Sequence, residues 1–337
     1  MVRIKDVAER CGLSIASVSK ALNGKSDLNP KTVEYVCSVA KEMGYIPNAT
    51  ARVLKTNRSY NIGILFVDTT SSGLEHEYFS SILNAVKEES EKNGFDITFI
   101  SNHVGNDYLT YYEHAKYRNC DGVIIASVDF HNPQVVKLVE SEIPTVTIDF
   151  EFNGKSSVIS DNISGLRDIV NYVVENGHRK IAFIHGENTD VTQKRLASFY
   201  KTCLDNGIEV DERFVKQGVY HLPQASGIAT RELLSLDDKP TCIIYPDDYS
   251  LLGGLTEIEK HGLSVPNDIS IVGYDGIRLS RLFRPELTTY IQDSKQIGVL
   301  AAKKLVEIIQ NPKSSIPERI VVEGKLQKGS TVGSLIK

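Results

Sequence analysis

Residues 2–23 read VRIKDVAERCGLSIASVSKALN, and their apolar spacing decides the fold of the start of the chain. Residues one helical turn apart predict the buried face of a first helix: Ile4, Val7, Ala8 and Cys11. Gly12 is suited to end that helix, and Ser14 is suited to cap a second helix, in which Val18 and Leu22 share a face. Two short helices joined by a tight glycine-containing turn are typical of a helix-turn-helix unit.

A third helix is predicted from Pro30 to about Met43, with Gly44 closing it. A helix-turn-helix unit lays its second helix in the major groove of DNA. The outward residues of that helix are small, polar or basic, which allows close approach to base edges and phosphates. The predicted DNA contacts in this region are Ser14, Ile15, Ala16, Ser17, Lys20 and Asn23. A helical protein-interaction domain with a solvated face is the alternative that the pattern leaves open.

Charge is distributed unevenly along the chain. The 337 residues carry a formal net charge of −5, although residues 1–59 contain ten Lys and Arg against five Asp and Glu. This block is therefore +5, and the remaining residues must carry −10 to give the total of −5. A basic block on an acidic body suggests a segment that meets a polyanion.

The composition is that of a globular chain, with 41% hydrophobic and 24% charged residues. The longest apolar runs, such as Ile62–Val67, are far shorter than the roughly 18 residues of a membrane helix. No apolar stretch follows the basic start, so no signal peptide is predicted and a cytoplasmic protein is expected. The five cysteines are scattered without a C-x-x-C pair, which favours reduced thiols over disulfides or a zinc cluster.

Residues 47–59 are predicted to link two parts of the chain. Pro47 suits a helix start, and Ala49 and Val53 are an i, i+4 pair. A helix of about ten residues is marginal in water by itself. We therefore expect this segment to order only when it packs against something, with an ordinary tether as the alternative.

From Asn61 onward, strand-like apolar runs alternate with helical segments. The runs are Ile62–Val67, Ile97–Ile100, Val123–Ala126, Thr145–Ile148, Ile181–Ile184, Cys242–Tyr245 and Ile269–Tyr274. This alternation favours parallel sheets with helices on both faces. About 270 residues are generous for one such sheet, so we expect two doubly wound α/β lobes. A ligand cleft is expected between them, at the carboxyl ends of the strands.

Polar and aromatic residues near these strand ends are predicted to converge on that cleft. They are Tyr78, Phe79, Asp161, Arg195, Asp248, Asp275 and Gln292. Aspartate accepts paired hydroxyls, arginine donates in a planar fork, and aromatic rings cover the C–H face of a sugar. The set is therefore that of a polyol site, although a lone Arg195 is more often a surface ion pair and Asp247-Asp248 more often a helix cap.

Residues 2–23, continuing to Gly44-Tyr-Ile-Pro-Asn48, resemble the DNA-binding headpiece of the lactose/galactose-repressor (LacI/GalR) family. The body resembles the family's effector domain, which has a periplasmic-binding-protein type I fold. The motifs that carry this second resemblance are Asp161–Gly165, Gly177–Ile184, Arg195–Phe199, Pro266–Asp275 and Arg284–Thr289.

The resemblance implies three parts of a bacterial regulator. They are a helix-turn-helix headpiece at residues 1–46, a hinge helix or linker at 47–59, and an effector-binding and dimerisation core at 60–337. Within the core, the N-lobe is expected at about 60–161 and 292–322, and the C-lobe at about 162–291 and 323–337.

The resemblance also assigns roles to residues. It implies a hinge helix that pairs with its dimer mate in the minor groove, with Leu54 wedged into the central base step. Further DNA contacts are expected from Asn48, Ala51 and Lys55. In the core, Arg195 and Asp275 inherit the family's effector contacts. Departures from the family pattern, among them Asp247, Ser198 and Gly276, leave the identity of the effector open.

The expected protein is therefore a transcriptional regulator, in the first place a repressor, that binds a near-palindromic operator as a homodimer and answers to a mono- or disaccharide. It would be nucleoid-associated when bound to DNA. No heptads occur at Lys328–Lys337, so a dimer is expected rather than a tetramer. A regulator whose main partner is a phosphocarrier protein, as in catabolite control, or one with a purine-type effector is the alternative.

Other function classes fit the sequence less well. No catalytic, metal-binding or cofactor motif is found: His76-Glu77 lacks the second His of H-E-x-x-H, and no G-x-S-x-G elbow is present. A sugar-binding transport receptor would share the fold of the body, but it needs export and has no use for residues 1–58.

Overall fold

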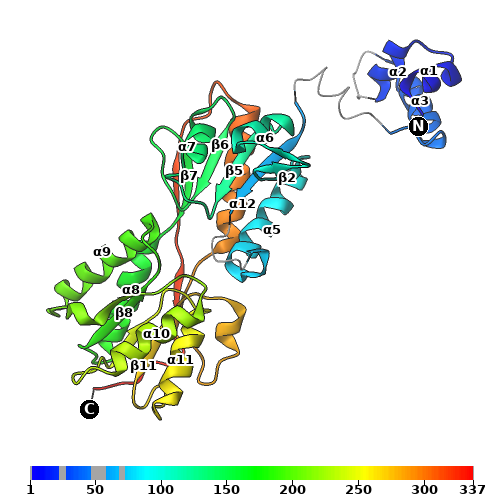
Figure 1. The fold of residues 1–337 in the computed structure, drawn as a ribbon. Coiled ribbons are helices and arrows are strands. Elements are labelled where there is room, and N and C mark those ends of the chain that lie inside the picture. The colour runs from blue at the N-terminus through cyan, green and yellow to red at the C-terminus, as the bar shows by residue number, and fades with distance from the viewer. Residues whose placement is uncertain (1, 23–27, 47–57, 68–72, 337) are drawn as a thin grey trace. The chain divides into compact units, whose positions relative to one another are not determined.

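The computed structural model describes residues 2–22, 28–46, 58–67 and 73–336. The chain divides into two compact units, Met1–Ser59 and Tyr60–Lys337 (Figure 1). Within the described ranges, no helix has both the length and the apolar character that crossing a membrane requires.

The first unit contains the three predicted helices: α1 (Ile4–Cys11), α2 (Ile15–Leu22) and α3 (Pro30–Glu42). Gly12 follows α1 with φ 66°, a left-handed conformation that glycine adopts without strain. The Ser14 hydroxyl accepts the Ser17 N–H at 3.1 Å and so caps the start of α2. A small buried core joins the helices: Val7, Ala8, Val18, Ala21, Val36, Val39 and Ala40.

The second unit begins with an N-lobe built on a six-stranded sheet in the order β13-β7-β6-β5-β1-β2. All of its neighbouring strands pair in parallel. The strands are β1 (Asn61–Phe66), β2 (Asp96–Ile100), β5 (Gly122–Ala126), β6 (Thr145–Ile148), β7 (Ser156–Ser160) and β13 (Arg319–Val322). Its helices are α5 (Glu77–Lys92), α6 (Tyr111–Tyr117), α7 (Pro133–Glu140) and α12 (Ser294–Gln310), and η1 (Gly73–Glu75) precedes α5.

The C-lobe is built on a second six-stranded sheet in the order β14-β12-β11-β10-β8-β9. Its pairs are parallel except at the edge, where β14 runs antiparallel to β12. The strands are β8 (Ile181–His185), β9 (Val215–Gln217), β10 (Cys242–Ile244), β11 (Ser270–Asp275), β12 (Thr289–Ile291) and β14 (Lys325–Gln327). The helices are α8 (Asn162–Glu175), α9 (Asp190–Asp205), α10 (Pro223–Leu234) and α11 (Leu251–Lys260), with short turns η2 (Glu212–Phe214) and η3 (Arg278–Arg281).

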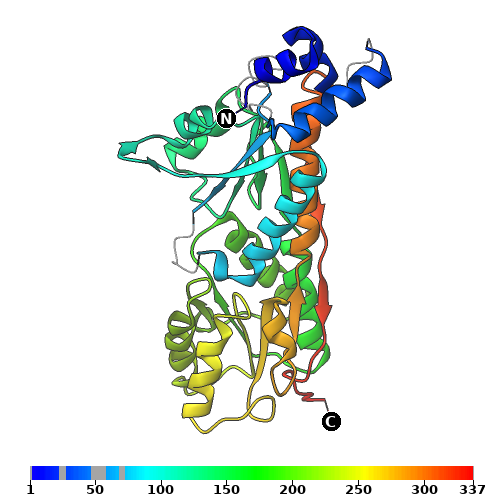
Figure 2. The same ribbon diagram turned by 90° about the vertical axis from the view of Figure 1, so that its right-hand side faces the viewer.

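The chain passes between the lobes at three places: from β7 to α8, from β12 to α12, and from β13 to β14. Consequently α12, although late in the sequence, packs against α5 and the N-lobe sheet, as Figure 2 shows. Its apolar residues Ile297, Ala301 and Leu305 are fully buried in the N-lobe core. Neither lobe is therefore a continuous piece of chain.

Several strands were not predicted from the sequence. β7 reads Ser-Ser-Val-Ile-Ser, and its serines hide the apolar signal of a strand that is buried along its whole length. β9, β13 and β14 are three or four residues long, too short for a periodic pattern. A further two-stranded hairpin, β3 (His103–Val104) with β4 (Asp107–Tyr108), was also missed.

Candidate functional site

The exposed face of α2 carries most of the predicted DNA contacts that the structure describes. Ser14, Ile15, Ala16 and Lys20 are exposed, whereas Ser17 is half-buried. Ile15 leaves 49% of its surface in water, so its side chain is available for contact. The opposite face of α2 supplies Val18 and Ala21 to the core. The helix is therefore anchored by its inner face, and its outer face stays exposed to solvent.

The remaining predicted DNA contacts are Asn23, Asn48, Ala51, Leu54 and Lys55. They lie outside the residues that the structure describes, as does most of the predicted hinge at 47–59.

A pocket of about 370 Å³ opens between the lobes at the carboxyl ends of both sheets. The N-lobe contributes the segments after β5 and β6, together with Tyr78 and Phe79 from the start of α5. The C-lobe contributes the segments after β8, β9, β11 and β12, together with Arg195 from α9. The pocket thus has the location that ligands prefer in open α/β sheets.

Arg195 is the fixed cation of this pocket. It is 4% exposed, its Nε donates to Asn162 Oδ1 at 2.8 Å, and its Nη1 donates to the Pro246 carbonyl at 2.9 Å. The guanidinium carbon lies 3.6 Å from the centre of the Tyr274 ring, so the plane is stacked as well as hydrogen-bonded. Burial by itself lowers the pKa of Arg195, but the acidic groups around it, among them the carboxylate of Asp275, raise the pKa overall, so the group stays charged.

Two carboxyl groups line the pocket: Asp275, which is buried, and Asp149, which is half-buried. Asp275 is 7% exposed and accepts from Gln292 Nε2 at 2.6 Å, while the Gln292 amide oxygen accepts from Ser160. Asp149 accepts the Ser160 N–H at 2.8 Å and the Tyr78 hydroxyl at 3.1 Å. Burial is the main cause that raises the pKa of both carboxyls above the usual range of aspartate. Such groups gain most from a ligand that brings hydrogen-bond donors or positive charge.

Aromatic rings form much of the remaining wall. Phe130 and Phe150 stack with ring centres 4.5 Å apart and planes 9° apart, and Phe79 packs beside Tyr78 with centres 5.2 Å apart. Tyr220 closes the C-lobe side and lies 5.7 Å from the Arg195 guanidinium. The pocket therefore combines flat apolar faces with carboxylates, an amide and one arginine.

The structure brings together five of the seven predicted effector residues. Tyr78, Phe79, Arg195, Asp275 and Gln292 all line the pocket.

Asp161 and Asp248 lie outside the lining. The Asp161 side chain accepts the Ser164 N–H and caps α8. Asp248 is fully buried, where it accepts the Ile277 N–H at 3.0 Å and the Thr289 hydroxyl at 2.6 Å. Its carboxylate ties the ends of β11 and β12 together behind the pocket, so its place in the structure is that of a support.

Several lining residues were missed by the sequence reasoning. Asp149 directly follows the predicted strand Thr145–Ile148, so the rule used for the other strand ends could have found it. Tyr220 and His221 follow β9, which is too short to be recognised. The segment Glu187–Asp190 lies between β8 and α9 and has no motif of its own.

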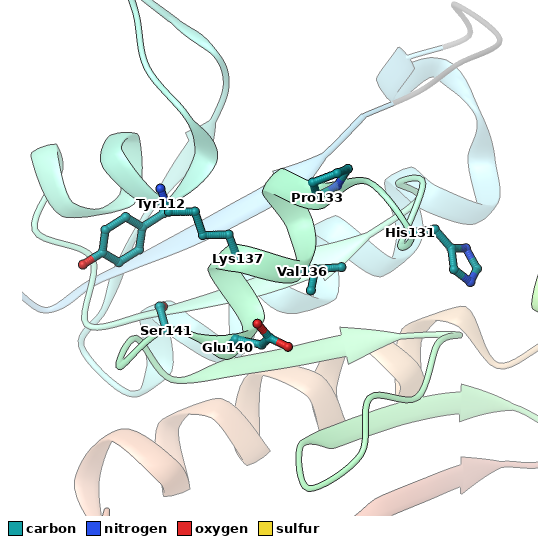
Figure 3. A pocket seen from close by; sticks show the side chains of 7 residues that line it. All are labelled: Tyr112, His131, Pro133, Val136, Lys137, Glu140 and Ser141. Atoms are coloured by element: carbon teal, nitrogen blue, oxygen red, sulfur yellow. The ribbon is translucent and has the colours of Figure 1, made fainter.

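A second hollow, of about 630 Å³, lies on the outer surface of α7 in the N-lobe (Figure 3). It is lined by Tyr112, His131, Pro133, Val136, Lys137, Glu140 and Ser141. None of these residues is buried, and their polar groups do not converge on one point. This hollow therefore lacks the enclosed polar groups that mark a small-molecule site.

Two family descriptions match the chain. "Bacterial regulatory proteins, lacI family" covers residues 3–48, and "Periplasmic binding protein-like domain" covers residues 170–332. The chain is 32% identical to the HTH-type transcriptional repressor PurR of Pasteurella multocida (strain Pm70), over 96% of both chains.

Solved structures give the same result. The Lac repressor dimer bound to operator and the anti-inducer ONPF is 26% identical, with a TM-score of 0.85, and the match covers 99% of both chains. A complex of the transcriptional regulator CelR with cellobiose is 26% identical, with a TM-score of 0.72, and covers 98% of this chain and 100% of that one.

The sequence resemblance and the predicted fold class are thus confirmed by the related sequences and by the solved structures. The helix-turn-helix unit matches the family's DNA-binding part, and the two parallel-sheet lobes match its core. The chain belongs to the lacI family of bacterial regulatory proteins, which are DNA-binding transcriptional repressors rather than enzymes.

Proposed function

We propose that this repressor binds a near-palindromic operator as a homodimer and that a small carbohydrate in the pocket between the lobes controls the binding. The repressor would bind its operator in the cytoplasm, on nucleoid DNA. The observation that carries the effector proposal is the pocket itself, in which Arg195, two aspartates and stacked aromatic rings face one space of about 370 Å³. That volume is at the lower end of the range for small-molecule sites.

The chemistry of the pocket favours a polyol over a nucleobase. Asp149 and Asp275 are acceptors whose burial favours ligands rich in hydroxyl donors, and Phe130 and Phe150 offer flat faces to sugar C–H groups. The CelR structure, which holds cellobiose, supports a carbohydrate of one or two rings. A purine-type effector is the second candidate class, and the titration below includes it.

The dimer is supported by apolar surface on the C-lobe. Leu222, Ile228 and Tyr249 are 38%, 54% and 42% exposed; Ile228 lies in α10, Leu222 just before α10 and Tyr249 just before α11. α10 and α11 pack against each other, so these side chains share one region of the lobe. One headpiece reads only a half-site, and a second copy supplies the other half of a palindrome. The Lac repressor in complex with operator is likewise a dimer.

Control of DNA binding would come from a change in the angle between the lobes. Two ion pairs cross the cleft in this conformation: Arg278 Nε with Glu77 Oε1 at 3.2 Å, and Lys194 with Glu151 at 3.0 Å. A ligand that binds between the lobes favours the lobe arrangement for which it has the higher affinity. The shift in the equilibrium between two such arrangements is set by the difference between the two affinities. Such couplings are typically about 5–150-fold, or about 1–3 kcal/mol, and they are reciprocal.

The test is a set of titrations on purified protein. Calorimetry with mono- and disaccharides and with nucleobases identifies the effector, and fluorescence anisotropy with operator DNA then measures the coupling. We expect Arg195→Ala to abolish the effect of the ligand on DNA binding. Basal operator affinity should stay close to wild type, because Arg195 belongs to the effector-binding unit and not to the DNA-binding helices. Arg213→Ala, which removes an exposed arginine of the same lobe, is the matched control. Normal ligand binding by Arg195→Ala would remove the basis of the proposal.

A further inference from the structure

Two histidines and an aspartate from distant parts of the chain meet beside the pocket. His76 immediately precedes α5 in the N-lobe, His221 lies between β9 and α10 in the C-lobe, and Asp275 ends β11. One ring nitrogen of each histidine and one carboxylate oxygen of Asp275 all lie within 4.8 Å of one another. The sequence predicted no metal site, because residues so far apart show none of the short spacings by which such sites are recognised.

The three side chains are shielded from water. His76 and Asp275 are 6% and 7% exposed, and the side chain of His221 is 10% exposed. The two imidazole rings are tilted against each other, with centres 3.5 Å apart and planes 44° apart. The ring of Phe79 lies 5.9 Å from each imidazole and covers one side of the pair. A polar cluster of this kind, buried against an aromatic ring, is suited to hold a desolvated ion.

Outer partners of the kind that metal ligands use are also present. Asp247 Oδ1 lies 3.6 Å from His221 Nδ1, and Asp247 is itself fixed by the Ser250 N–H at 2.7 Å. Gln292 donates to one oxygen of Asp275 at 2.6 Å and leaves the other for a ligand. Metal-bound histidines usually have a carboxylate beside the ring nitrogen that does not bind the metal, and ligating carboxylates are in turn hydrogen-bonded.

The backbone at two of these residues is held in an unfavourable conformation. His221 has φ 59° and Asp275 has φ 96°, a region that residues with a β-carbon enter at a cost. Conformations of this kind cluster at ligand sites, where the surrounding structure enforces them. Here both residues lie beside His76.

We propose that His76, His221 and Asp275 bind one Zn²⁺, or a divalent transition metal of similar softness, and that the ion ties the N-lobe to the C-lobe. Two imidazoles and one carboxylate are a ligand set of zinc sites that keep a fourth position open. Mg²⁺ and Ca²⁺ prefer oxygen ligands and do not match it. With zinc–ligand distances of about 2.0–2.2 Å, tetrahedral donors lie about 3.4 Å apart. The three ligand atoms lie within 4.8 Å of one another here, so the side chains must adjust when the ion binds.

The fourth position of the ion opens toward the pocket, because His221 and Asp275 both line it. The ion would join two lobes that already meet at the neighbouring Glu77–Arg278 pair. It would therefore favour the closed arrangement of the cleft and supply a positive charge to its wall. Any effect of the metal on DNA binding rests on the proposed function, whereas metal binding itself does not.

The experiment measures metal binding by the full chain, prepared without a polyhistidine tag and freed of metal by a chelator. Cys11, Cys37 and Cys120, which are not buried, are replaced by serine so that thiols do not take up the ion. Calorimetry in competition with a zinc chelator is expected to give one saturable Zn²⁺ site per chain and no binding of Mg²⁺. Binding should also raise the melting temperature of the core. Co²⁺ in place of Zn²⁺ should show the visible absorption bands of a tetrahedral site.

The variants His76→Asn and His221→Asn test the ligands one lobe at a time. Loss of an outer partner of a metal site costs about 10–100-fold in affinity, so loss of a direct ligand should cost at least about 100-fold. His103→Asn changes an exposed histidine of the N-lobe and should bind as tightly as the parent protein. The melting temperature of each metal-free variant shows whether the variant is folded. Asp247→Asn is a second test: it keeps all three ligands, removes the carboxylate beside His221, and should weaken Zn²⁺ binding by about 10–100-fold.

Absence of a one-to-one site in the parent protein, or unchanged affinity in both histidine variants, would overturn the metal proposal. Carbohydrate titrations of both the metal-free and the Zn²⁺-loaded protein separate the two proposals. Zn²⁺ binding without carbohydrate binding leaves the metal site standing and removes the proposed effector, and the reverse result removes the metal site alone. Protonation of the histidine pair without any binding of Zn²⁺ would also overturn the metal proposal.

Discussion

At the scale of single residues, Arg195 is held in place before any ligand arrives. Its Nε and Nη1 donate to Asn162 and to the Pro246 carbonyl, and its plane rests on Tyr274. A side chain that is already fixed loses little conformational freedom on binding, so more of its interaction energy remains for the ligand. This preorganisation explains why a buried, charged residue is tolerated at the pocket wall.

His178 gives the protein a pH-dependent stability. It is 1% exposed, and its ring nitrogens lie 2.9 Å from Thr241 Oγ1 and 2.9 Å from the Gly333 carbonyl oxygen. Burial lowers the pKa of His178 below its usual value, and the bond to Gly333 opposes this only in part. The unfolded chain therefore binds the proton more readily, and stability rises with pH in this window. We expect the contribution of His178 to be complete above about pH 6.5 and to decline as the pH falls below it.

The measurement is the melting temperature of wild type and His178→Gln between pH 5 and pH 8. The variant should melt lower throughout, because it loses partners on two segments, but its curve should fall less steeply toward acid. His103→Asn serves as the control, since that residue is exposed. Parallel curves for wild type and His178→Gln would contradict the assignment.

How much of the site the sequence predicts depends on where each residue stands relative to a recognisable strand. Arg195 and Asp275 were found because they belong to family motifs beside long apolar strands. Tyr220 and His221 follow a strand of three residues, and no local pattern marks them. Asp248 follows a strand as well, but its side chain points back to Thr289, a choice that depends on packing between β11 and β12.

At the scale of elements, α8 is seated so closely against the C-lobe sheet that one glycine controls the contact. A β-carbon at Gly165 would lie 2.2 Å from the Tyr274 hydroxyl and 2.9 Å from the Tyr290 ring. We expect Gly165→Ala to lower the free energy of unfolding by about 1–3 kcal/mol, as overpacked cores do. Since Tyr274 supports Arg195, the ligand should also bind more weakly. Chemical denaturation and calorimetry measure the two effects.

Tyr274→Phe offers a rescue for this variant. Among the described residues, the Tyr274 hydroxyl is a buried group without a hydrogen-bond partner, so its removal should cost little by itself. Adding it to Gly165→Ala should restore part of the lost stability, because the atom nearest to the new methyl group is gone. Ile163→Ala, at an exposed position of the same helix, should leave both properties near wild type. No recovery in the double variant would show that the backbone of α8, and not Tyr274, carries the strain.

The elements themselves could be predicted where burial produces a long apolar run. β1, β5 and β11 have five or six residues and are almost wholly apolar or small, so their type and position were clear. β7 is just as buried, but three of its five residues are serine. The Ser156 hydroxyl accepts the Glu318 N–H from the segment before β13, and Ser160 contacts Gln292. Such partners are distant in sequence, so this strand could be recognised only after folding.

At the scale of the whole molecule, we expect the exposed apolar residues of α10 and its surroundings to form the dimer contact. Ile228→Asp introduces a charge at a side chain that is 54% exposed, so the folded monomer should tolerate it. Light scattering should show a shift from dimer to monomer, and operator affinity should fall because the two half-sites are then bound independently. Ile163→Asp, at a 50% exposed position of α8, is the control. A variant that stays dimeric would place the interface elsewhere.

The three passages between the lobes have a consequence for the order in which the protein can be completed during its synthesis. When a ribosome has added residue 293, every strand of the C-lobe sheet except β14 exists, yet the N-lobe still lacks α12 and β13. In the nascent chain, the apolar face of α5 and the N-lobe strands then remain uncovered until Ile297, Ala301 and Leu305 have been synthesised. Unfinished cores of this kind are prone to aggregate and are common clients of chaperones. A premature stop before α12 would therefore damage the N-lobe, although most of that lobe is translated before the C-lobe.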